Sequence, residues 1–256
     1  KMGILGVAIA TLIAQLVSAI LVIIHLMKSE DVYKLVLKNI RLDIEMLWDI
    51  IRMGVPTGIQ QTVVSFSNVL VQSYINSFGA SAMAGFSASD KYHAFLAMPT
   101  NSLSLTITTF TSQNLGANKK ERVQIGIRTA TAMAIVAVVV LGIPTFVFAE
   151  RLISIFSDSP EVIAFGAREL RIRVPFYAFL AINAILSGAL RGGGLTIVPM
   201  LIMIFSFTIL RQVFLLITMK INRSMDMIFW SYSVTWFVSM VLTIIYYRKS
   251  KWIEKA

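Results

Sequence analysis

A long apolar segment ends at residues 111–122 in the sequence TSQNLGANKKER. Polar residues and Gly116 stop a membrane-length helix here, and a cluster of basic residues follows directly. Because basic residues collect in the cytoplasmic connections of membrane proteins, this stretch predicts which side of a bilayer the helix end faces. The same segment contains Asp90 and Lys91, whose charges are costly in lipid and need protein or water around them. Together these features favour a conduit over a simple membrane anchor.

The composition is that of an integral membrane protein. Hydrophobic residues make up 57% of the 256-residue chain and its mean hydropathy is +0.77, whereas a soluble domain is roughly 45–50% apolar. The sequence has no cysteine, which excludes disulfides, zinc-thiolate sites and thiol nucleophiles. It also has no serine-nucleophile, HExxH or paired-carboxylate motif, so we expect neither an enzyme nor a bound metal or cofactor.

Seven apolar runs are long enough to cross a bilayer as helices. They predict an all-α, polytopic helix bundle with spans at about 3–27, 54–77, 82–116, 124–148, 162–190, 196–219 and 226–247. The first run is too long for the core of a signal peptide and no small-residue cleavage site follows it. We therefore interpret it as a true span.

The net charge of +10 fits the positive-inside pattern better than a nucleic-acid-binding pattern. Most basic residues occupy alternate connections between the runs, and the C-terminal group at 248–255 falls on the basic side. A group at Arg168, Arg171 and Arg173 lies on the other side and weakens the bias. We expect a multi-pass protein of the cell membrane, a bacterial inner membrane, with a cytoplasmic C-terminus. Its expected partner is the lipid bilayer and not nucleic acid.

Residues 28–53 form the one long connection, and their pattern predicts an amphipathic helix at the membrane surface. The apolar residues at helical spacing are Val32, Leu35, Val36 and Ile40, then Met46, Leu47, Ile50 and Ile51. Gly54 and Pro56 predict the start of the second span, because proline is tolerated in the first turn of a helix.

The second predicted span carries polar side chains along one face. They are Gln61, Ser65, Asn68, Gln72 and Asn76, at spacings of four, three, four and four. Lipid cannot satisfy amides, so this face must meet other helices or water. The pattern leaves two interpretations open: hydrogen bonds between helices or the lining of a substrate cavity.

The third predicted span carries a stripe of small or polar residues at alternating spacings of three and four. The stripe consists of Ser87, Asp90, Ala94, Ala97, Asn101, Ser104, Thr108 and Thr111. Small residues allow close approach of helices, which predicts a partner helix against the stripe, and Pro99 permits a kink. Asp90 and Lys91 form either a pair near the membrane face or a cation or proton site.

Arg211 lies too deep in the sixth run to reach the interface easily. It needs a carboxylate, carbonyl or water partner, which indicates a structural or gating role. His93 is interpreted as a hydrogen-bonded helix residue rather than a proton relay. The run Arg191-Gly192-Gly193-Gly194 has neither the preceding strand nor the following Lys-Ser/Thr of a phosphate loop, so it predicts a tight turn.

Several stretches together resemble the multidrug and toxic compound extrusion (MATE) family, whose members consist of two six-helix lobes. The similar motifs are Gly54-Val55-Pro56, Gln113-Asn114-Leu115-Gly116-Ala117 with Arg122, Pro160-Glu161-Val162, and Leu190-Arg191-Gly192-Gly193-Gly194 with Pro199. The resemblance covers nearly the whole chain. It implies that residues 1–27 are the last transmembrane helix of the N-terminal lobe, 28–53 the amphipathic inter-lobe connection, and 54–256 the six-helix C-terminal lobe.

The resemblance implies a secondary active antiporter that exports drugs or toxic, amphipathic organic cations in exchange for H⁺ or Na⁺. The sequence opens in a hydrophobic helix without an initiator methionine, so we expect a fragment whose partner is the missing N-terminal lobe. The expected substrate and ion pathway consists of Gln61, Ser65, Asn68, Gln72, Asp90, Lys91 and Asn101. The expected gating or structural residues are Pro99, Gly116, Arg122, Arg191 and Arg211.

Some members of that family hold a cation with carboxylates of the second lobe, at places that fall near Val64 and Leu180 here. Both residues are apolar, which argues against a second-lobe Na⁺ site and for coupling in the N-terminal lobe. Two other functions stay open. One is a lipid-linked precursor flippase of the related superfamily, for which an arginine-rich cavity is expected. The other is a truncated membrane protein that does not transport.

Overall fold

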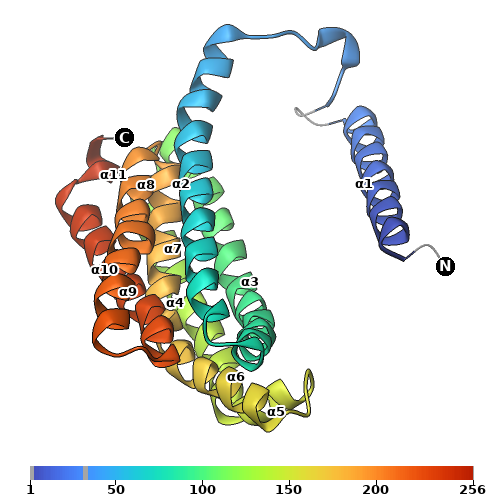
Figure 1. Cartoon of the computed structure of the whole chain (residues 1–256). Coiled ribbons are helices and arrows are strands. Elements are labelled where there is room, and N and C mark those ends of the chain that lie inside the picture. Colours follow the sequence, from blue (N-terminus) through green and yellow to red (C-terminus); the bar gives the residue numbers. More distant parts are fainter. Residues whose placement is uncertain (1–2, 31–33, 256) are drawn as a thin grey trace. The chain divides into compact units, whose positions relative to one another are not determined.

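The computed structural model describes residues 3–30 and 34–255. Within these ranges the chain forms α-helices, two short 3-10 helices and one π-helix, and it forms no strand (Figure 1). The chain divides into two compact units, one up to Asp49 and one from Ile50 onward. The first unit contains helix α1 (Gly3–Lys28) and the 3-10 helix η1 (Leu37–Asn39). Helix α1 is apolar and buries none of its span within the structure, as expected of a helix that faces lipid.

Helix α2 (Ile44–Asn76) begins where Asp43 caps it. Oδ1 of Asp43 accepts hydrogen bonds from the backbone N–H groups of Glu45 (3.1 Å) and Met46 (3.2 Å). These bonds satisfy donors that every helix start leaves free. The helix then continues through Gly54 and Pro56, so the prediction that these residues mark its start is wrong.

The predicted amphipathic helix over 28–53 is also wrong as a separate element. The described residues 34–43 contain only the turn η1, and Val32 lies outside the described residues. The residues from Ile44 to Met53 are helical, but they are the first turns of α2. Their helical periodicity is therefore real, and the cap at Asp43 moves the start of the helix ahead of the predicted one.

The second unit is a helix bundle. After α2 its helices are α3 (Ala80–Gly116), α4 (Lys120–Val147), α5 (Ala149–Ser154), α6 (Pro160–Arg173), α7 (Tyr177–Gly192), α8 (Ile197–Ile204), α9 (Arg211–Ile221), α10 (Met225–Lys249) and α11 (Trp252–Lys255). Helix α3 packs against α4, α6 and α7, and α10 packs against α6 and α7 (Figure 1). Val71, Leu96, Ile185 and Phe229 are among the fully buried core residues.

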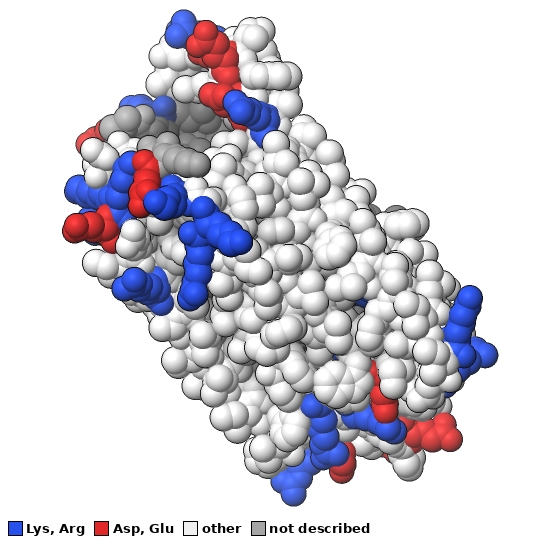
Figure 2. All heavy atoms as spheres, turned by 90° about the vertical axis from the view of Figure 1, so that its left-hand side faces the viewer, with Lys and Arg blue, Asp and Glu red and all other residues white. Residues whose placement is uncertain are grey.

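Five of the seven predicted spans are long and apolar enough to cross a membrane: α1, α4, α6 with α7, α8 with α9, and α10. The other two correspond to α2 and α3, which have 33 and 37 residues but carry many polar side chains. Charged residues gather near the ends of the face shown in Figure 2 and leave a broad uncharged band between them. The chain is an all-α, polytopic membrane protein.

Two of the spans are interrupted. The 3-10 helix η2 (Val174–Phe176), which contains Pro175, separates α6 from α7. The π-helix η3 (Phe205–Leu210) separates α8 from α9. A π-helix is wound more widely than an α-helix, with hydrogen bonds to the fifth following residue. The carbonyl of Phe207 in η3 accepts a hydrogen bond from Oγ of Ser67 on α2 at 2.7 Å.

Helices α3 and α7 approach closely through small residues. A Cβ atom added to Gly188 would lie 2.6 Å from the carbonyl oxygen of Ser104, and one added to Gly192 would lie 2.3 Å from that of Thr108. At the same contact, Oγ of Ser104 donates to the Ala184 carbonyl at 2.8 Å. Small residues allow this approach and make the side chain–backbone bonds possible.

Candidate functional site

The two faces of helix α2 differ. One face packs on the η3 region: Ser67 is fully buried, and Gln60, 4% exposed, donates to Sδ of Met203 at 2.8 Å. The other face carries the predicted polar row, in which Gln61, Ser65, Asn68 and Asn76 are exposed and Gln72 is half-buried. Gln72 donates to Oδ1 of Asn76 at 2.8 Å, within the same row.

The polar stripe of α3 changes from exposed to buried along the helix. Ser87, Asp90, Lys91 and Asn101 are exposed, whereas Ser104 and Thr111 are buried against neighbouring helices. A strict spacing of three and four residues drifts by about 20° per heptad relative to an α-helix. The stripe therefore winds around α3, and the predicted partner helix, which is α7, covers only its second half.

The bundle encloses a cluster of charged and polar side chains that we call the buried charge cluster: His93, Glu169, Arg173, Arg211 and Tyr232. Glu169 on α6 is fully buried. Its Oε1 accepts a hydrogen bond from Nη1 of Arg173, one helical turn further along. Its two oxygens also lie 2.9 and 2.7 Å from Nε2 of His93 on α3. An ionised carboxylate only accepts hydrogen bonds, so Nε2 of His93 is the donor.

Two guanidinium groups of this cluster contact one aromatic ring. Cζ of Arg173 lies 3.8 Å from the ring centroid of Tyr232, and Cζ of Arg211 lies 4.4 Å from it. Phe207 adds a second aromatic contact to Arg211, at 5.4 Å. Cation–π contacts strengthen when both partners are removed from water. The rings therefore stabilise two like charges for which Glu169 is the only carboxylate in the cluster.

Arg211 connects the buried charge cluster to the exposed face of α2. Its Nη1 donates to Oδ1 of Asn68 at 3.0 Å, and its Nη2 lies 3.5 Å from Oγ1 of Thr235 on α10. The prediction that Arg211 needs a polar partner is confirmed, and that partner is an amide oxygen. The interpretation of His93 as a hydrogen-bonded helix residue is also confirmed.

Both oxygens of Glu169 are engaged by N–H donors, and a guanidinium lies beside them. Such a site does not suit a metal cation, because a metal needs free oxygen ligands and is repelled by the neighbouring positive charge. Among the described residues, no group of three or more His, Asp or Glu side chains is arranged to hold a metal ion. Nδ1 of His93 is buried and has no hydrogen-bond partner among the described residues.

The predicted gating and structural residues lie apart from one another. Pro99 lies inside α3, and Gly116 is the last residue of that helix, followed by Asn118 with φ of 55°. Arg122 lies over the ring of Phe110 at 6.0 Å. The predicted turn at Arg191 is confirmed by the end of α7 at Gly192 and by Gly194 with φ of 81°. The Arg191 side chain reaches back to Oγ of Ser104 at 3.3 Å.

Glu169 and Arg173 were missed as site residues. In the sequence, Arg168, Arg171 and Arg173 stand out only as a group that weakens the positive-inside bias. Arg168 and Arg171 do lie on the surface, paired with Asp226 and Glu150. The signal that separates Arg173 is its spacing of four from Glu169, which places two opposite charges on one helix face within a span.

The chain matches the MatE family over residues 56–217. It is 29% identical to the probable multidrug resistance protein YoeA of Bacillus subtilis over 209 residues, which are 80% of this chain and 45% of YoeA. It is 32% identical to the probable multidrug resistance protein NorM of Thermotoga maritima over 206 residues, which are 80% of this chain and 44% of NorM. The chain thus spans about half the length of these curated relatives.

Solved structures share the fold. A multidrug resistance MATE family transporter of the MOP superfamily, in an outward-facing conformation, superposes with a TM-score of 0.90 at 18% identity over 99% of this chain and 58% of its own. A MOP superfamily transporter from Pyrococcus furiosus, described as having a binding pocket of reverse polarity, gives a TM-score of 0.91 at 18% identity, over 100% of this chain and 58% of its own. With the match over more than half of its residues, the chain belongs to the MatE family of membrane transporters.

Proposed function

We propose that the chain forms one lobe of a secondary active efflux transporter of the cell membrane, which exports amphipathic organic cations in exchange for H⁺ or Na⁺. The observation that carries this proposal is the exposed polar face of α2 and α3, which includes Gln61, Ser65 and Asn101. Lipid cannot satisfy these side chains. A water-filled cavity shared with a second lobe would satisfy them, and the relatives named as multidrug resistance proteins support that arrangement.

Within this cavity the exposed residues would have different tasks. Gln61, Ser65, Gln72 and Asn101 supply directional hydrogen bonds, which polyspecific sites use sparingly. Asp90 supplies the negative charge that an organic cation needs, and Lys91 beside it would keep that attraction weak enough for release.

The coupling ion is expected to bind in the other lobe. Both oxygens of Glu169 already accept hydrogen bonds from N–H donors, and a guanidinium lies beside them. In the complete protein we therefore expect His93→Gln to leave the ion dependence of transport unchanged. Loss of that dependence in a stably folded variant would place the coupling site in the buried charge cluster.

Cysteine labelling tests the water-filled cavity directly, because the chain contains no cysteine. In the complete protein, with any cysteine outside this chain replaced, Ser65→Cys and Asn101→Cys should react with a charged, membrane-impermeant thiol reagent. Val136→Cys and Val140→Cys on the apolar helix α4 are the controls. These valines are 60% and 61% exposed, so their side chains are accessible but are expected to face lipid and not water. Reaction of all four variants, or of neither member of the first pair, would refute a cavity on α2 and α3.

Transport itself is tested with the complete protein in everted membrane vesicles. We expect movement of a cationic dye that depends on an imposed H⁺ or Na⁺ gradient and weakens in Asp90→Asn. The matched control is Asp226→Asn, because Asp226 pairs with Arg168 outside the polar face. Movement of a lipid-linked pyrophosphate without dye movement would support a flippase instead. A well-folded protein that moves neither compound would be a membrane protein without transport activity.

A further inference from the structure

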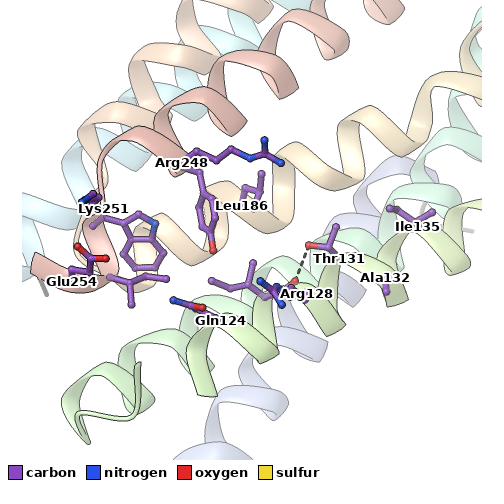
Figure 3. A pocket seen from close by; sticks show the side chains of 13 residues that line it. Gln124, Arg128, Thr131, Ala132, Ile135, Leu186, Arg248, Lys251 and Glu254 are labelled. Atoms are coloured by element: carbon purple, nitrogen blue, oxygen red, sulfur yellow. Dashed lines mark hydrogen bonds between the residues drawn. The ribbon is translucent and has the colours of Figure 1, made fainter. Parts of the chain in front are cut away.

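A second feature of the molecule, apart from the polar face and the buried charge cluster, is a cavity of about 640 Å³ at the end of the bundle where α4 begins and α10 ends. Its α4 wall carries Gln124, Arg128 and Thr131. Its other wall carries Arg248 from the end of α10, Lys251 from the connection that follows, and Glu254 from α11 (Figure 3). Ile127 and Leu186 form its buried apolar base.

The charges around this cavity are unbalanced. Arg128, Arg248 and Lys251 line it together with a single carboxylate, Glu254, and none of the three is in an ion pair within the described residues. The backbone carbonyl of Glu254 accepts a hydrogen bond from Nζ of Lys120 at 3.1 Å, which ties α11 to the start of α4. The cavity is therefore a built pocket with a surplus of positive charge.

The length of α4 allows this cavity to lie at the height of a lipid headgroup. Helix α4 has 28 residues, a length of about 42 Å at 1.5 Å per residue, which exceeds the roughly 30 Å hydrocarbon core. Its first turns, where Arg128 lies, can thus sit at the interface while the later turns cross the core. The apolar residues Ile127 and Ile135 continue from the cavity along α4 toward the core. A ligand that fits has an anionic head and an apolar tail.

A second cavity of the same volume gives an internal comparison. It lies at the opposite end of the bundle, between the ends of α2 and α9, and it is also about 640 Å³. Arg223 is the basic residue in its lining, and that side chain hydrogen-bonds to the Ser77 carbonyl at 3.5 Å. The α4–α10 cavity therefore has the larger positive surplus of these two cavities of equal volume.

We infer that the α4–α10 cavity binds an anionic phospholipid. Arg128, Arg248 and Lys251 would contact its phosphate, and an acyl chain would lie along Ile127 and Ile135. Basic pockets between transmembrane helices recognise lipid phosphate in this way. The apolar base distinguishes a lipid from a free organic or inorganic phosphate, which would leave that surface without a partner. This site does not depend on the proposed transport function, because it requires only that the helices span a bilayer.

The test uses the protein purified in neutral detergent, with binding of phosphatidylglycerol and phosphatidylcholine measured by native mass spectrometry. We expect selective retention of phosphatidylglycerol. Each basic residue near a membrane surface contributes a factor of about 5 to anionic lipid binding, so the triple variant Arg128→Gln/Arg248→Gln/Lys251→Gln should weaken it on the order of 100-fold. The control Arg223→Gln, in the second cavity, should leave binding unchanged.

Two further measurements keep the outcome decisive if the triple variant unfolds. Arg128→Lys preserves the charge and should retain most of the binding, whereas Arg128→Gln alone should lose about 5-fold. Inorganic phosphate at millimolar concentration should not displace the lipid. Equal retention of the two lipids, full binding by the triple variant, or displacement by inorganic phosphate would each overturn the proposal, the last by showing a free-phosphate site.

Discussion

The exposed face of α2 and α3 and the buried charge cluster both place polar groups inside a membrane bundle, but they satisfy them differently. Glu169, Arg173 and Arg211 are almost fully buried and find partners in one another, in His93 and in aromatic rings. On the exposed face, Gln61, Ser65 and Asn101 have no such enclosure. A charge inside a low-dielectric bundle must be paired to be tolerated. A polar group outside it must instead meet water or another chain segment.

This difference separates what holds the bundle together from what is available to a ligand. The buried charge cluster joins α3, α6, α9 and α10 and has little freedom to change its partners. The exposed face has polar groups that are free for exchange. Substitutions in the interior should therefore change stability, whereas substitutions on the face should change function first.

The largest effect is expected for Glu169→Gln, which leaves Arg173 buried without its carboxylate. Removing one partner of a buried ion pair costs about 3–5 kcal/mol, so the unfolding free energy should fall by that amount in an SDS titration followed by tryptophan fluorescence. Glu150→Gln is the control, because Glu150 pairs with Arg171 on the surface and such pairs contribute at most about 1 kcal/mol. Equal losses in the two variants would contradict the distinction between interior and surface.

A smaller effect is expected at the close contact of α3 and α7. Gly188→Ala places a methyl group against the Ser104 carbonyl, and overpacking of this kind costs about 1–3 kcal/mol. Gly58→Ala is the matched change in α2, where a Cβ atom meets nothing within 4 Å. There the greater helix propensity of alanine should stabilise the protein by about 0.5–1 kcal/mol. Gly188→Ala should lower the thermal midpoint of unfolding and Gly58→Ala should raise it. If both variants shifted the midpoint in the same direction, the close contact between α3 and α7 would be contradicted.

The smallest of the three effects is expected for Asn68→Ala, at the point where the two regions meet. This change removes an acceptor from Arg211. Because Asn68 is exposed, water can replace part of the lost bond, and the cost should be at the low end for a bond to a charged group, about 1.5 kcal/mol. Gln61→Ala, seven residues earlier on the exposed row, should change the unfolding free energy by no more than about 0.5 kcal/mol. If both variants unfold alike, Asn68 belongs to the exposed face alone and does not connect the regions.

Much of the fold could be predicted from the sequence, because long apolar runs leave few alternatives to a helix in lipid. Helices α4 (Lys120–Val147) and α10 (Met225–Lys249) lie within a few residues of their predicted ranges. The start of α2 could not be placed from Gly54 and Pro56, since a single side-chain cap at Asp43 decides it. The turn after Arg191 was predicted correctly because a run of three glycines allows the backbone conformation that Gly194 adopts.

The candidate site was predicted in part. The polar row of α2 could be predicted because amide side chains are costly in lipid and therefore stand out in a membrane-length apolar run. Arg211 could be predicted for the same reason. The hydrogen bond between His93 and Glu169 could not be predicted, because these residues are 76 positions apart in the sequence and meet only where α3 packs on α6. The π-helix η3 was not predicted, because the hydrophobic pattern of an apolar run is the same whether the run forms an α-helix or a π-helix.

The π-helix η3 (Phe205–Leu210) has a consequence for changes in chain length. A turn closed by a bond to the fifth following residue holds one residue more than a turn of α-helix. Deleting one residue between Phe205 and Leu210 should let this segment relax to an α-helix while α8 and α9 keep their neighbours. The same deletion inside α7 would rotate every later side chain of that helix by about 100°. Evolution and protein engineering can therefore shorten this bundle by one residue at η3 with far less disturbance than inside α7.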